Sequence, residues 1–338
     1  MDKYYDFSNC KPSLKEFGGS DKKESVFFDG KRYMLKYNDE IPVDKRNENT
    51  SSSRNNVFSE YVSCHIVSSL DIPVQNTLIG HRNGHIVVAC EDFCVNGYDL
   101  NEFEKNGSTA GYKFKETRYP EIKDILSFVR KDNRIEPELV EKRFWDTFVI
   151  DSLLGNFDRH TGNWGYLFND DIPDIKLAPV YDCGACLYPM ISDRAMDKIV
   201  SSRNEVDKRI YQYPCAAFVN NGRKISYYDF MTSSETLSDY PLLMKSIKEI
   251  TPKVSLDAIS KIISNTPEMT EAREHFYRVM IKARYEQILV PAYEKTISRT
   301  PISLDERIAQ AKKICEKENA IRKEQSPSKS KNVDDILL

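Results

Sequence analysis

The sequence lacks three features that would each assign it to a large class of proteins. No stretch of its 338 residues approaches the roughly 18 consecutive apolar residues of a membrane span. Residues 1–10 are polar and aromatic, without the apolar core of a secretory signal peptide. The formal net charge of −3 gives no basic field of the kind that nucleic-acid binding usually needs. We therefore expect a soluble, cytoplasmic monomer that binds neither membranes nor nucleic acid directly, with a secreted effector that has no readable signal as the alternative.

The eight cysteines do not form a recognisable metal motif. Several of them lie in apolar runs, as Cys90 does, and this indicates small buried hydrophobic residues in a reducing compartment. Cys90 with Cys94 and Cys183 with Cys186 could together offer four sulfurs to zinc. Neither pair lies in a Gly/Pro-rich knuckle, so we disfavour a zinc site.

Two turn dipeptides predict β-hairpins in the first hundred residues. Asp29-Gly30 and Asn83-Gly84 each lie between two short β-type runs, and both dipeptides tolerate the positive φ that tight hairpin turns require. The runs are residues 26–28 and 32–37 around the first turn, and 77–79 and 86–88 around the second. Between the hairpins, residues 38–56 are polar and predict a loop or a partly disordered insert. Residues 57–70 have helical spacing of apolar residues.

From about Tyr98 the pattern becomes mainly helical. Helices are predicted at 120–132, 137–154 and 269–296, and a short β segment at 164–168 and 176–180 interrupts them. We therefore expect an α+β chain with a β-rich N-lobe over residues 1–97 and a larger helical C-lobe over residues 98–324. Residues 325–338 are too polar to pack and predict a disordered tail.

The strongest chemical signal is the segment 155–163, GNFDRHTGN, which follows a long apolar helix and precedes a short strand. Asp158 can accept the proton of an attacking hydroxyl group, while Asn163 can offer a neutral oxygen to magnesium. The same separation of base and metal-binding Asn occurs in the catalytic loop of protein kinases. His160 is more suited to shaping this loop by hydrogen bonding than to acting as an acid or base. The segment therefore indicates phosphoryl transfer.

A second carboxylate, Asp182, ends the predicted strand 175–181. It begins the sequence Asp182-Cys183-Gly184, a D-x-G in which cysteine replaces the phenylalanine of kinases. The predicted β segments at 164–180 would bring this strand end next to the loop that carries Asp158. We therefore predict that Asp182 is the main magnesium ligand and that Asn163 is the second.

The N-terminal part offers groups that could bind a nucleotide. Gly18-Gly19-Ser20 and Lys23 precede the first hairpin, where glycines would expose backbone N–H groups to phosphates. Lys36, on the strand 32–37, is either a solvent-facing edge lysine or an inward phosphate ligand that pairs with Glu60 of the next helix. The apolar run 86–90 leads to Glu91-Asp92-Phe93, which resembles a hinge whose backbone would bind adenine.

In this order, the elements between about Gly18 and Gly184 resemble those of the HipA-like serine/threonine kinases, especially short members without an additional N-terminal domain. The resemblance implies a bilobal protein-kinase-like fold with the ATP site between the lobes. It implies ATP and Mg²⁺ as cofactors, a protein substrate, autophosphorylation and an antitoxin-type partner. The implied roles are Asp158 as base, Lys36 as ATP-phosphate ligand, Asn163 and Asp182 as metal ligands, and Lys23 and the backbone of residues 91–93 as nucleotide contacts.

Two alternatives and one departure accompany this interpretation. The D-R-H-x-x-N pattern of residues 158–163 fits phosphoinositide kinases equally well, although the chain has no basic amphipathic segment for an anionic membrane. An inactive kinase-fold binding protein would be expected to have lost one of four residues that are all present: Lys36, Asp158, Asn163 and Asp182.

Several family members autophosphorylate a serine just before the loop glycines, where this chain has Glu16 and Phe17; Ser13 and Ser20 are the candidate replacements.

Overall fold

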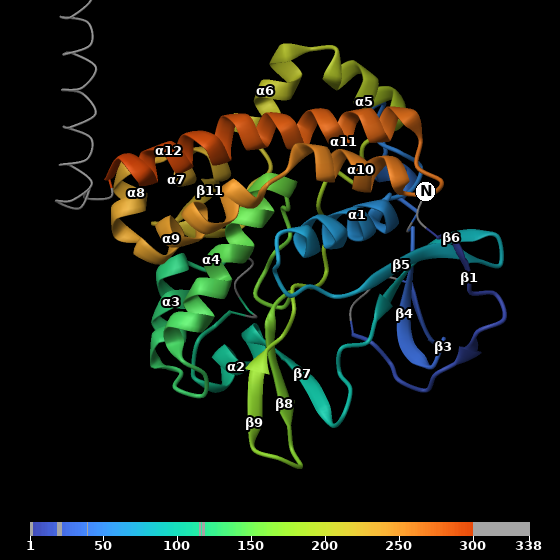
Figure 1. Cartoon of the computed structure of the whole chain (residues 1–338), viewed down its shortest axis with the longest axis horizontal. Helices are drawn as coiled ribbons and strands as arrows, with labels where there is room; N and C mark the ends of the chain where they lie inside the picture. The colour runs from blue at the N-terminus through green and yellow to red at the C-terminus, as the bar shows by residue number, and fades with distance from the viewer. Residues whose placement is uncertain (1–2, 19–21, 39, 115, 117–118, 300–338) are drawn as a thin grey trace, which may run out of the picture. The chain divides into compact units, whose positions relative to one another are not determined.

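The computed structural model describes residues 3–18, 22–38, 40–114, 116 and 119–299. The described residues up to Thr296 belong to one compact unit. The predicted tail at 325–338 lies outside the described residues. The proposed lobe boundary at residue 97 lies between strands β6 and β7. Most elements before this residue are strands, and most elements after it are helices (Figure 1).

The N-terminal elements form a six-stranded sheet with the order β1-β5-β6-β4-β3-β2. Both predicted hairpins are confirmed: β3 pairs antiparallel with β4, and β5 with β6. Their turns adopt the expected left-handed backbone, with φ of 47° at Asp29 and 74° at Gly30, and 50° at Asn83 and 81° at Gly84. The strands are β1 (Tyr5–Asp6), β2 (Lys11–Pro12), β3 (Lys23–Phe28), β4 (Lys31–Tyr37), β5 (Thr77–Arg82) and β6 (His85–Glu91).

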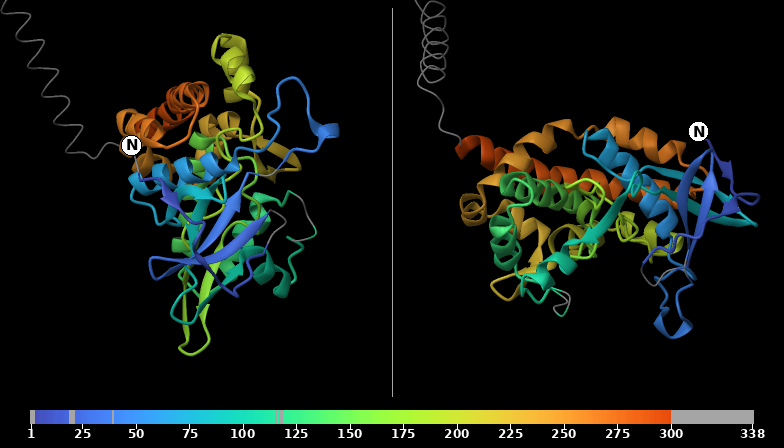
Figure 2. Two further views of the ribbon diagram at one scale, coloured as in Figure 1. Left: turned by 90° about the vertical axis from the view of Figure 1, so that its right-hand side faces the viewer. Right: turned by 90° about the horizontal axis from the view of Figure 1, so that it is seen from below.

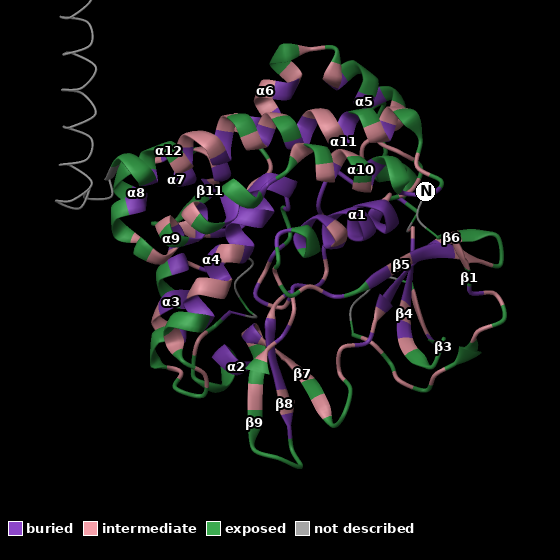
Figure 3. Cartoon of the chain, in the orientation of Figure 1, coloured by how far each residue is buried: buried purple, intermediate pink, exposed green. Residues whose placement is uncertain are grey.

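The sheet has two different faces, because neighbouring residues of a strand point to opposite sides. Tyr33, Leu35 and Tyr37 of β4 belong to a small apolar cluster on one face. On the other face lies helix α1 (Asn56–Ser69), which confirms the predicted helix and is buried over most of its length (Figures 1 and 3). Lys36 is therefore on the side of β4 that faces away from this apolar cluster.

The loop between β4 and α1 was predicted, but its contacts with the C-terminal part were not. It contains one short 3₁₀ turn, Val43–Lys45, and extends away from the sheet (Figure 2). The backbone N–H of Ser51 donates to the Met190 carbonyl (2.9 Å), and that of Asn55 donates to the Pro189 carbonyl (2.8 Å). The loop is thus held against the segment that follows Asp182 along the chain.

The C-terminal part is built around helix α4 (Pro137–Leu154), which begins with proline at its first turn, as predicted, and is largely buried (Figure 3). The predicted helix 269–296 forms as α11 and α12, joined by a π-helical turn at Tyr285–Leu289. None of the helices in the described ranges combines the length and apolar character that crossing a membrane requires. The other helices are α2 (Phe103–Thr109), α3 (Ile122–Lys131), α5 (Asp193–Val200), α6 (Arg203–Tyr211), α7 (Tyr227–Thr232), α8 (Ser234–Asp239), α9 (Pro241–Ile250), the 3₁₀ turn Thr251–Lys253, α10 (Leu256–Asn265), α11 (Glu271–Arg284) and α12 (Val290–Arg299).

The β segments predicted at 164–168 and 176–180 form as two paired strands, β8 and β9, but the strands of two further segments in this part were not predicted. Strand β7 (Tyr98–Glu102) joins β8 (Gly165–Asn169) and β9 (Asp174–Leu177) in a three-stranded sheet. Strands β10 (Cys215–Asn220) and β11 (Arg223–Ser226) form a further hairpin. The strand predicted at 175–181 ends at Leu177, and only an isolated bridge from Val180 to Val74 continues it.

Candidate active site

The loop after α4 is fixed by buried hydrogen bonds that begin at the end of the helix. Gly155 closes the helix in the left-handed conformation, with φ of 65°. Asn156 is fully buried, and its Nδ2 donates to Oδ1 of Asp151 (2.9 Å) while its Oδ1 accepts the backbone N–H of Asp158 (3.0 Å). Tyr227 Oη donates to the Asn156 carbonyl (2.7 Å). The backbone at Asp158 is therefore positioned by groups inside the core.

Arg159 joins three parts of the site, a role that the sequence analysis did not predict. Its side chain is only 4% exposed, and Nε donates to Asp151 Oδ2 (3.0 Å) on α4. Nη1 donates to the carbonyls of Asn163 (3.2 Å) and Tyr181, and Nη2 contacts Cys183 Sγ (3.4 Å). Burial would lower the pKa of this guanidinium, but the Asp151 carboxylate raises the pKa well above its ordinary value. Arg159 thus holds the segments around Asp158 and Asp182 together as a cation.

Asp158 and Asn163 lie in one turn of this loop. Asn163 Nδ2 donates to the Asp158 carbonyl (2.8 Å), which leaves Oδ1 of the amide as an acceptor. The N–H of Gly162 donates to Nδ1 of His160 (3.0 Å), so the histidine ring supports the turn. The Asp158 side chain lies at the surface, yet partial desolvation raises the pKa of its carboxyl group. Asp182 raises this pKa further, while His160 opposes the shift.

Asp182 lies at the point where three structural elements meet. Its backbone is left-handed, with φ of 57°, a conformation that costs energy in a non-glycine residue. Oδ1 accepts from Lys36 Nζ (2.9 Å), and 43% of the side chain is exposed. The Lys36 ammonium lowers the pKa of Asp182 to about 2, because it stabilises the ionised form. Asp182 is thus an ionised carboxylate that faces solvent on one side.

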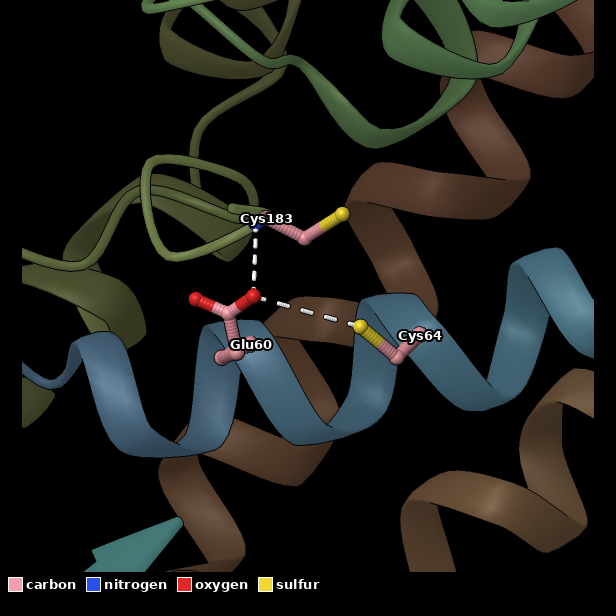
Figure 4. A group of neighbouring side chains, drawn as sticks. All are labelled: Glu60, Cys64 and Cys183. Atoms are coloured by element: carbon pink, nitrogen blue, oxygen red, sulfur yellow. Dashed lines mark hydrogen bonds between the residues drawn. The ribbon is translucent and has the colours of Figure 1, made fainter. Parts of the chain in front are cut away.

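Lys36 and Glu60 form a buried ion pair, so the interpretation of Lys36 as a surface residue is wrong. The Lys36 side chain is 7% exposed and that of Glu60 is 1% exposed, and Nζ lies 2.8 Å from Oε2. Burial would lower the pKa of Lys36, but the carboxylates of Asp182 and Glu60 raise it well above its usual value. Oε1 of Glu60 accepts the backbone N–H of Cys183 (2.8 Å; Figure 4). Glu60 therefore connects the strand lysine to the Asp182 loop.

The predicted phosphate loop is described only at its ends. Gly18 and Lys23 are placed, whereas Gly19 and Ser20 lie outside the described residues. Lys23 Nζ donates to the Gly18 carbonyl, and its charge contributes to lowering the pKa of Asp182. The side chain at the start of β3 is therefore close enough to act on the same site as Lys36.

The predicted hinge is mostly engaged in contacts within the protein. The Glu91 N–H donates to the Asn76 carbonyl (2.9 Å), and the Glu91 carbonyl accepts from Gln75 Nε2 (3.0 Å). The Asp92 N–H donates to the Arg32 carbonyl (2.9 Å). Of the three predicted residues, Phe93 alone has a backbone N–H for which no hydrogen bond is found in the described part of the chain.

The side chains of the hinge are structural. The Asp92 carboxylate, 2% exposed, accepts from Lys15 Nζ and Arg32 Nη1, both at 2.9 Å. The Phe93 ring packs on the ring of Tyr181 with centroids 5.6 Å apart. Asp92 thus connects Lys15, which precedes the glycine segment, to the end of β6, and Phe93 connects the hinge to the residue just before Asp182.

The cysteines are arranged differently from the two pairs considered for zinc. Cys94 packs beside Phe93 and Tyr181, away from Cys183 and Cys186. The structure instead brings Cys64 and Cys183 together with Glu60 (Figure 4). Cys64 was missed, although its position four residues after Glu60 on a predicted helix places both on one face. All seven cysteines in the described ranges are free thiols.

Comparisons with known proteins agree with this geometry. The family model for the HipA-like C-terminal domain matches residues 16–209, more than half of the chain. The chain belongs to the HipA-like C-terminal domain family. The resemblance inferred from the motifs is therefore confirmed, as are the kinase-like α+β fold and the prediction of a phosphotransferase.

Two relatives are informative. Serine/threonine-protein kinase CtkA of Helicobacter pylori is 37% identical over 295 residues, which cover 86% of this chain and 88% of the relative. The crystal structure of CtkA matches with a TM-score of 0.79 at 35% identity, over 88% of this chain and 99% of that one. HipA of Shewanella oneidensis, solved with HipB and its operator DNA, matches with a TM-score of 0.52 at 16% identity, over 86% and 68% of the two chains. The likeness to HipA of Shewanella oneidensis shows the fold alone.

Proposed function

We propose that this HipA-like phosphotransferase is an ATP- and Mg²⁺-dependent serine/threonine protein kinase. The observation that carries the proposal is the position of Lys36 Nζ, buried between Glu60 Oε2 (2.8 Å) and Asp182 Oδ1 (2.9 Å). A lysine held in this way by a helix glutamate and a metal-binding aspartate is the arrangement that kinases use on ATP phosphates. The name of the relative CtkA, a serine/threonine-protein kinase, supports the substrate class.

The residues around Asp182 fit a magnesium ion. Magnesium prefers oxygen ligands, and the low pKa of Asp182 keeps its partly exposed carboxylate ionised at neutral pH. Asn163 can offer Oδ1, because its Nδ2 is already bonded to the Asp158 carbonyl. When bound, the metal would neutralise charge on the β- and γ-phosphates. Lys36 would then turn from Asp182 towards the phosphates while keeping its bond to Glu60, and Lys23 would add a second cation.

Asp158 has the properties of a general base. Its carboxylate is accessible, whereas its backbone is fixed from inside the core through Asn156. The raised pKa brings the carboxylate closer to the pH at which it works, which favours proton transfer from a serine or threonine hydroxyl. Asp158 would accept that proton while the hydroxyl oxygen attacks the γ-phosphorus. We also propose that His160, which lies in the same loop, contacts the bound nucleotide.

Adenine would be bound next to the end of β6. An adenine ring requires a donor and an acceptor at its edge. In the described residues, the backbone groups of the predicted hinge to which no protein partner is assigned are the Phe93 N–H and the carbonyls of Asp92 and Phe93. We therefore narrow the proposed hinge contact from Glu91-Asp92-Phe93 to its last two residues.

A direct test follows labelled phosphate from ATP. The purified chain is incubated with MgATP carrying a labelled γ-phosphoryl group, and with either a protein lysate or phosphoinositide vesicles. We expect label on serine and threonine of proteins, and on the chain itself if Ser13 or Ser20 is autophosphorylated. Label that appears only in lipid would favour the phosphoinositide-kinase alternative, and nucleotide binding without transfer would favour a binding protein. An antitoxin-type partner remains a prediction; in the Shewanella oneidensis structure HipA is accompanied by HipB.

A further inference from the structure

A group of potential metal ligands lies next to the Lys36–Glu60 ion pair, on the side of Glu60 that does not contact Lys36. Oxygen of Glu60 and the sulfurs of Cys64 and Cys183 all lie within 4.8 Å of one another (Figure 4). Glu60 and Cys64 come from one face of α1, whereas Cys183 follows Asp182 on a different segment. The three residues are 1–2% exposed. The two thiols have no role in the proposed phosphoryl-transfer chemistry, whereas the Glu60 carboxylate also holds Lys36.

The distances are close to those of a tetrahedral zinc site. With Zn–S of about 2.3 Å and Zn–O of about 2.0 Å, ligand atoms of such a site lie roughly 3.5–3.8 Å apart. Cys64 Sγ is 4.0 Å from Glu60 Oε1. Side-chain movements of about 1 Å or less would therefore bring the three atoms to coordinating positions. Cys186, fully buried, donates its N–H to the Cys183 carbonyl (3.1 Å) and could supply a fourth sulfur from the same turn.

The surroundings of the sulfurs suit a soft divalent cation more than magnesium. Thiolates select zinc and similar ions, whereas magnesium requires oxygen ligands. Arg159 Nη2 contacts Cys183 Sγ (3.4 Å), and such outer hydrogen bonds orient the ligands of metal sites. The two cations next to the group are already paired, Arg159 with Asp151 (3.0 Å) and Lys36 with Asp182 (2.9 Å). The local charge is therefore nearly balanced before a metal enters and two thiol protons leave.

Binding here would act on the nucleotide site through Glu60. One oxygen of that carboxylate faces Cys64 and the Cys183 N–H, and the other holds Lys36. A dication at the first oxygen repels the Lys36 ammonium and draws the carboxylate away from it. It also links α1 to the Asp182 loop through Cys183. Both effects disturb the position of the lysine that we assign to the ATP phosphates.

We propose that Glu60, Cys64 and Cys183 form an inhibitory binding site for Zn²⁺ or a similar thiophilic divalent cation. The metal site stands on its own geometry, whereas its inhibitory effect rests on the proposed kinase function. This proposed site has other ligands than the zinc site that we disfavoured from the sequence: Glu60 and Cys64 take the place of Cys90 and Cys94.

Cobalt(II) tests the site without any measurement of activity. Cobalt replaces zinc in thiolate sites and gives sulfur-to-cobalt charge-transfer absorption together with the visible bands of tetrahedral coordination. The intact chain is titrated with Co²⁺, then with Zn²⁺, beside Cys64→Ala, Cys64→Ser and the control Cys94→Ser, all checked for folding by circular dichroism. We expect the bands in the wild type and in Cys94→Ser, their loss in both Cys64 variants, and their displacement by zinc. Absence of the bands in the wild type, or their persistence in folded Cys64→Ala, would overturn the site.

A second measurement tests the inhibition. The dissociation constant of MgATP is determined by calorimetry with magnesium in large excess, with and without saturating free zinc. Zinc should weaken MgATP binding by about tenfold in the wild type and in Cys94→Ser, because the loss of a charge-assisted phosphate contact has about that effect. The MgATP affinity of Cys64→Ala should not change when zinc is added. Unchanged affinity in a wild-type chain that shows the cobalt bands would refute inhibition while leaving the metal site. A chain that never transfers phosphate would refute the proposed function, and the cobalt spectra would still decide the site.

Discussion

Replacing Lys36 by methionine should damage both stability and nucleotide binding, because the lysine is buried between two carboxylates. Methionine keeps much of the volume but removes the ammonium that pairs with Glu60 (2.8 Å) and Asp182 (2.9 Å). Removing one partner of a buried ion pair typically costs about 3–5 kcal/mol of unfolding free energy. We expect a value near the lower end, about 3 kcal/mol, because Asp182 is 43% exposed and can be solvated, and because Glu60 keeps its hydrogen bond from the Cys183 N–H.

The nucleotide effect is separate from the stability effect. A charge-assisted hydrogen bond to phosphate contributes about 1.5–3 kcal/mol, so folded Lys36→Met should bind MgATP about 10- to 150-fold more weakly than the wild type. Adding Glu60→Gln should recover part of the lost stability, since it removes the unpaired buried charge, and the nucleotide effects of the two changes should be less than additive.

Urea unfolding and calorimetric titration with MgATP measure the two quantities on the wild type, Lys36→Met, Glu60→Gln and the double variant. Lys45→Met, in the exposed loop before α1, is a matched control that removes a surface lysine. It should change the unfolding free energy by less than about 0.5 kcal/mol. Unchanged MgATP affinity together with unchanged turnover in folded Lys36→Met would refute the assignment of the N-lobe site.

Three further predictions concern Arg159, Asp182 and the two loop serines. Arg159→Met should lower the unfolding free energy by about 3–5 kcal/mol in urea, because Asp151 loses a buried partner, and Asp151→Asn in the same chain should restore part of it; a loss below about 1 kcal/mol would contradict the role of Arg159. Since Lys36 lowers the pKa of Asp182 to about 2, the stability from their contact is fully present above about pH 4 and is lost as the pH falls towards 2. Wild type should therefore lose more stability than Asp182→Asn over that interval, and parallel curves would count against the contact. Mass spectrometry after incubation with MgATP should find any autophosphorylation at Ser13 or Ser20, with lower activity in the modified chain; phosphate confined to the segment after Lys323 would contradict this.

The parts of the fold that could be predicted are those whose signal is local. Asp29-Gly30 and Asn83-Gly84 mark hairpins because their backbone requirement is met within two residues, and α1 is marked by the spacing of its own apolar residues. Strand β7 carries no such signal, since it becomes a strand only by pairing with β8 far along the chain. Asn221-Gly222, between β10 and β11, is a turn signal as strong as the other two, with φ of 52° and 72°, and the hairpin there could have been predicted.

The candidate site divides in the same way. Lys36, Glu60, Asp158, Asn163 and Asp182 could be named because they occur in motifs with fixed order, and the structure brings these residues together. The role of Arg159 could not be predicted from the sequence, because its partners lie on α4, in the loop after it and in the segment just before Asp182. Contacts that join three separate segments do not produce a motif of fixed spacing in the sequence.

The direct test of phosphoryl transfer by this chain is the rate of transfer in Asp158→Asn. Asparagine preserves the shape of the side chain but cannot accept the proton of a hydroxyl group, and the Asp158 backbone keeps its bond to Asn156. Single-turnover transfer of labelled phosphate to protein should fall by about 100-fold or more, while calorimetry should find MgATP affinity within about twofold of the wild type. Transfer to serine or threonine by the wild type, with near-wild-type transfer by Asp158→Asn, would show that another group is the base. No transfer to any protein by the wild type would contradict the account itself.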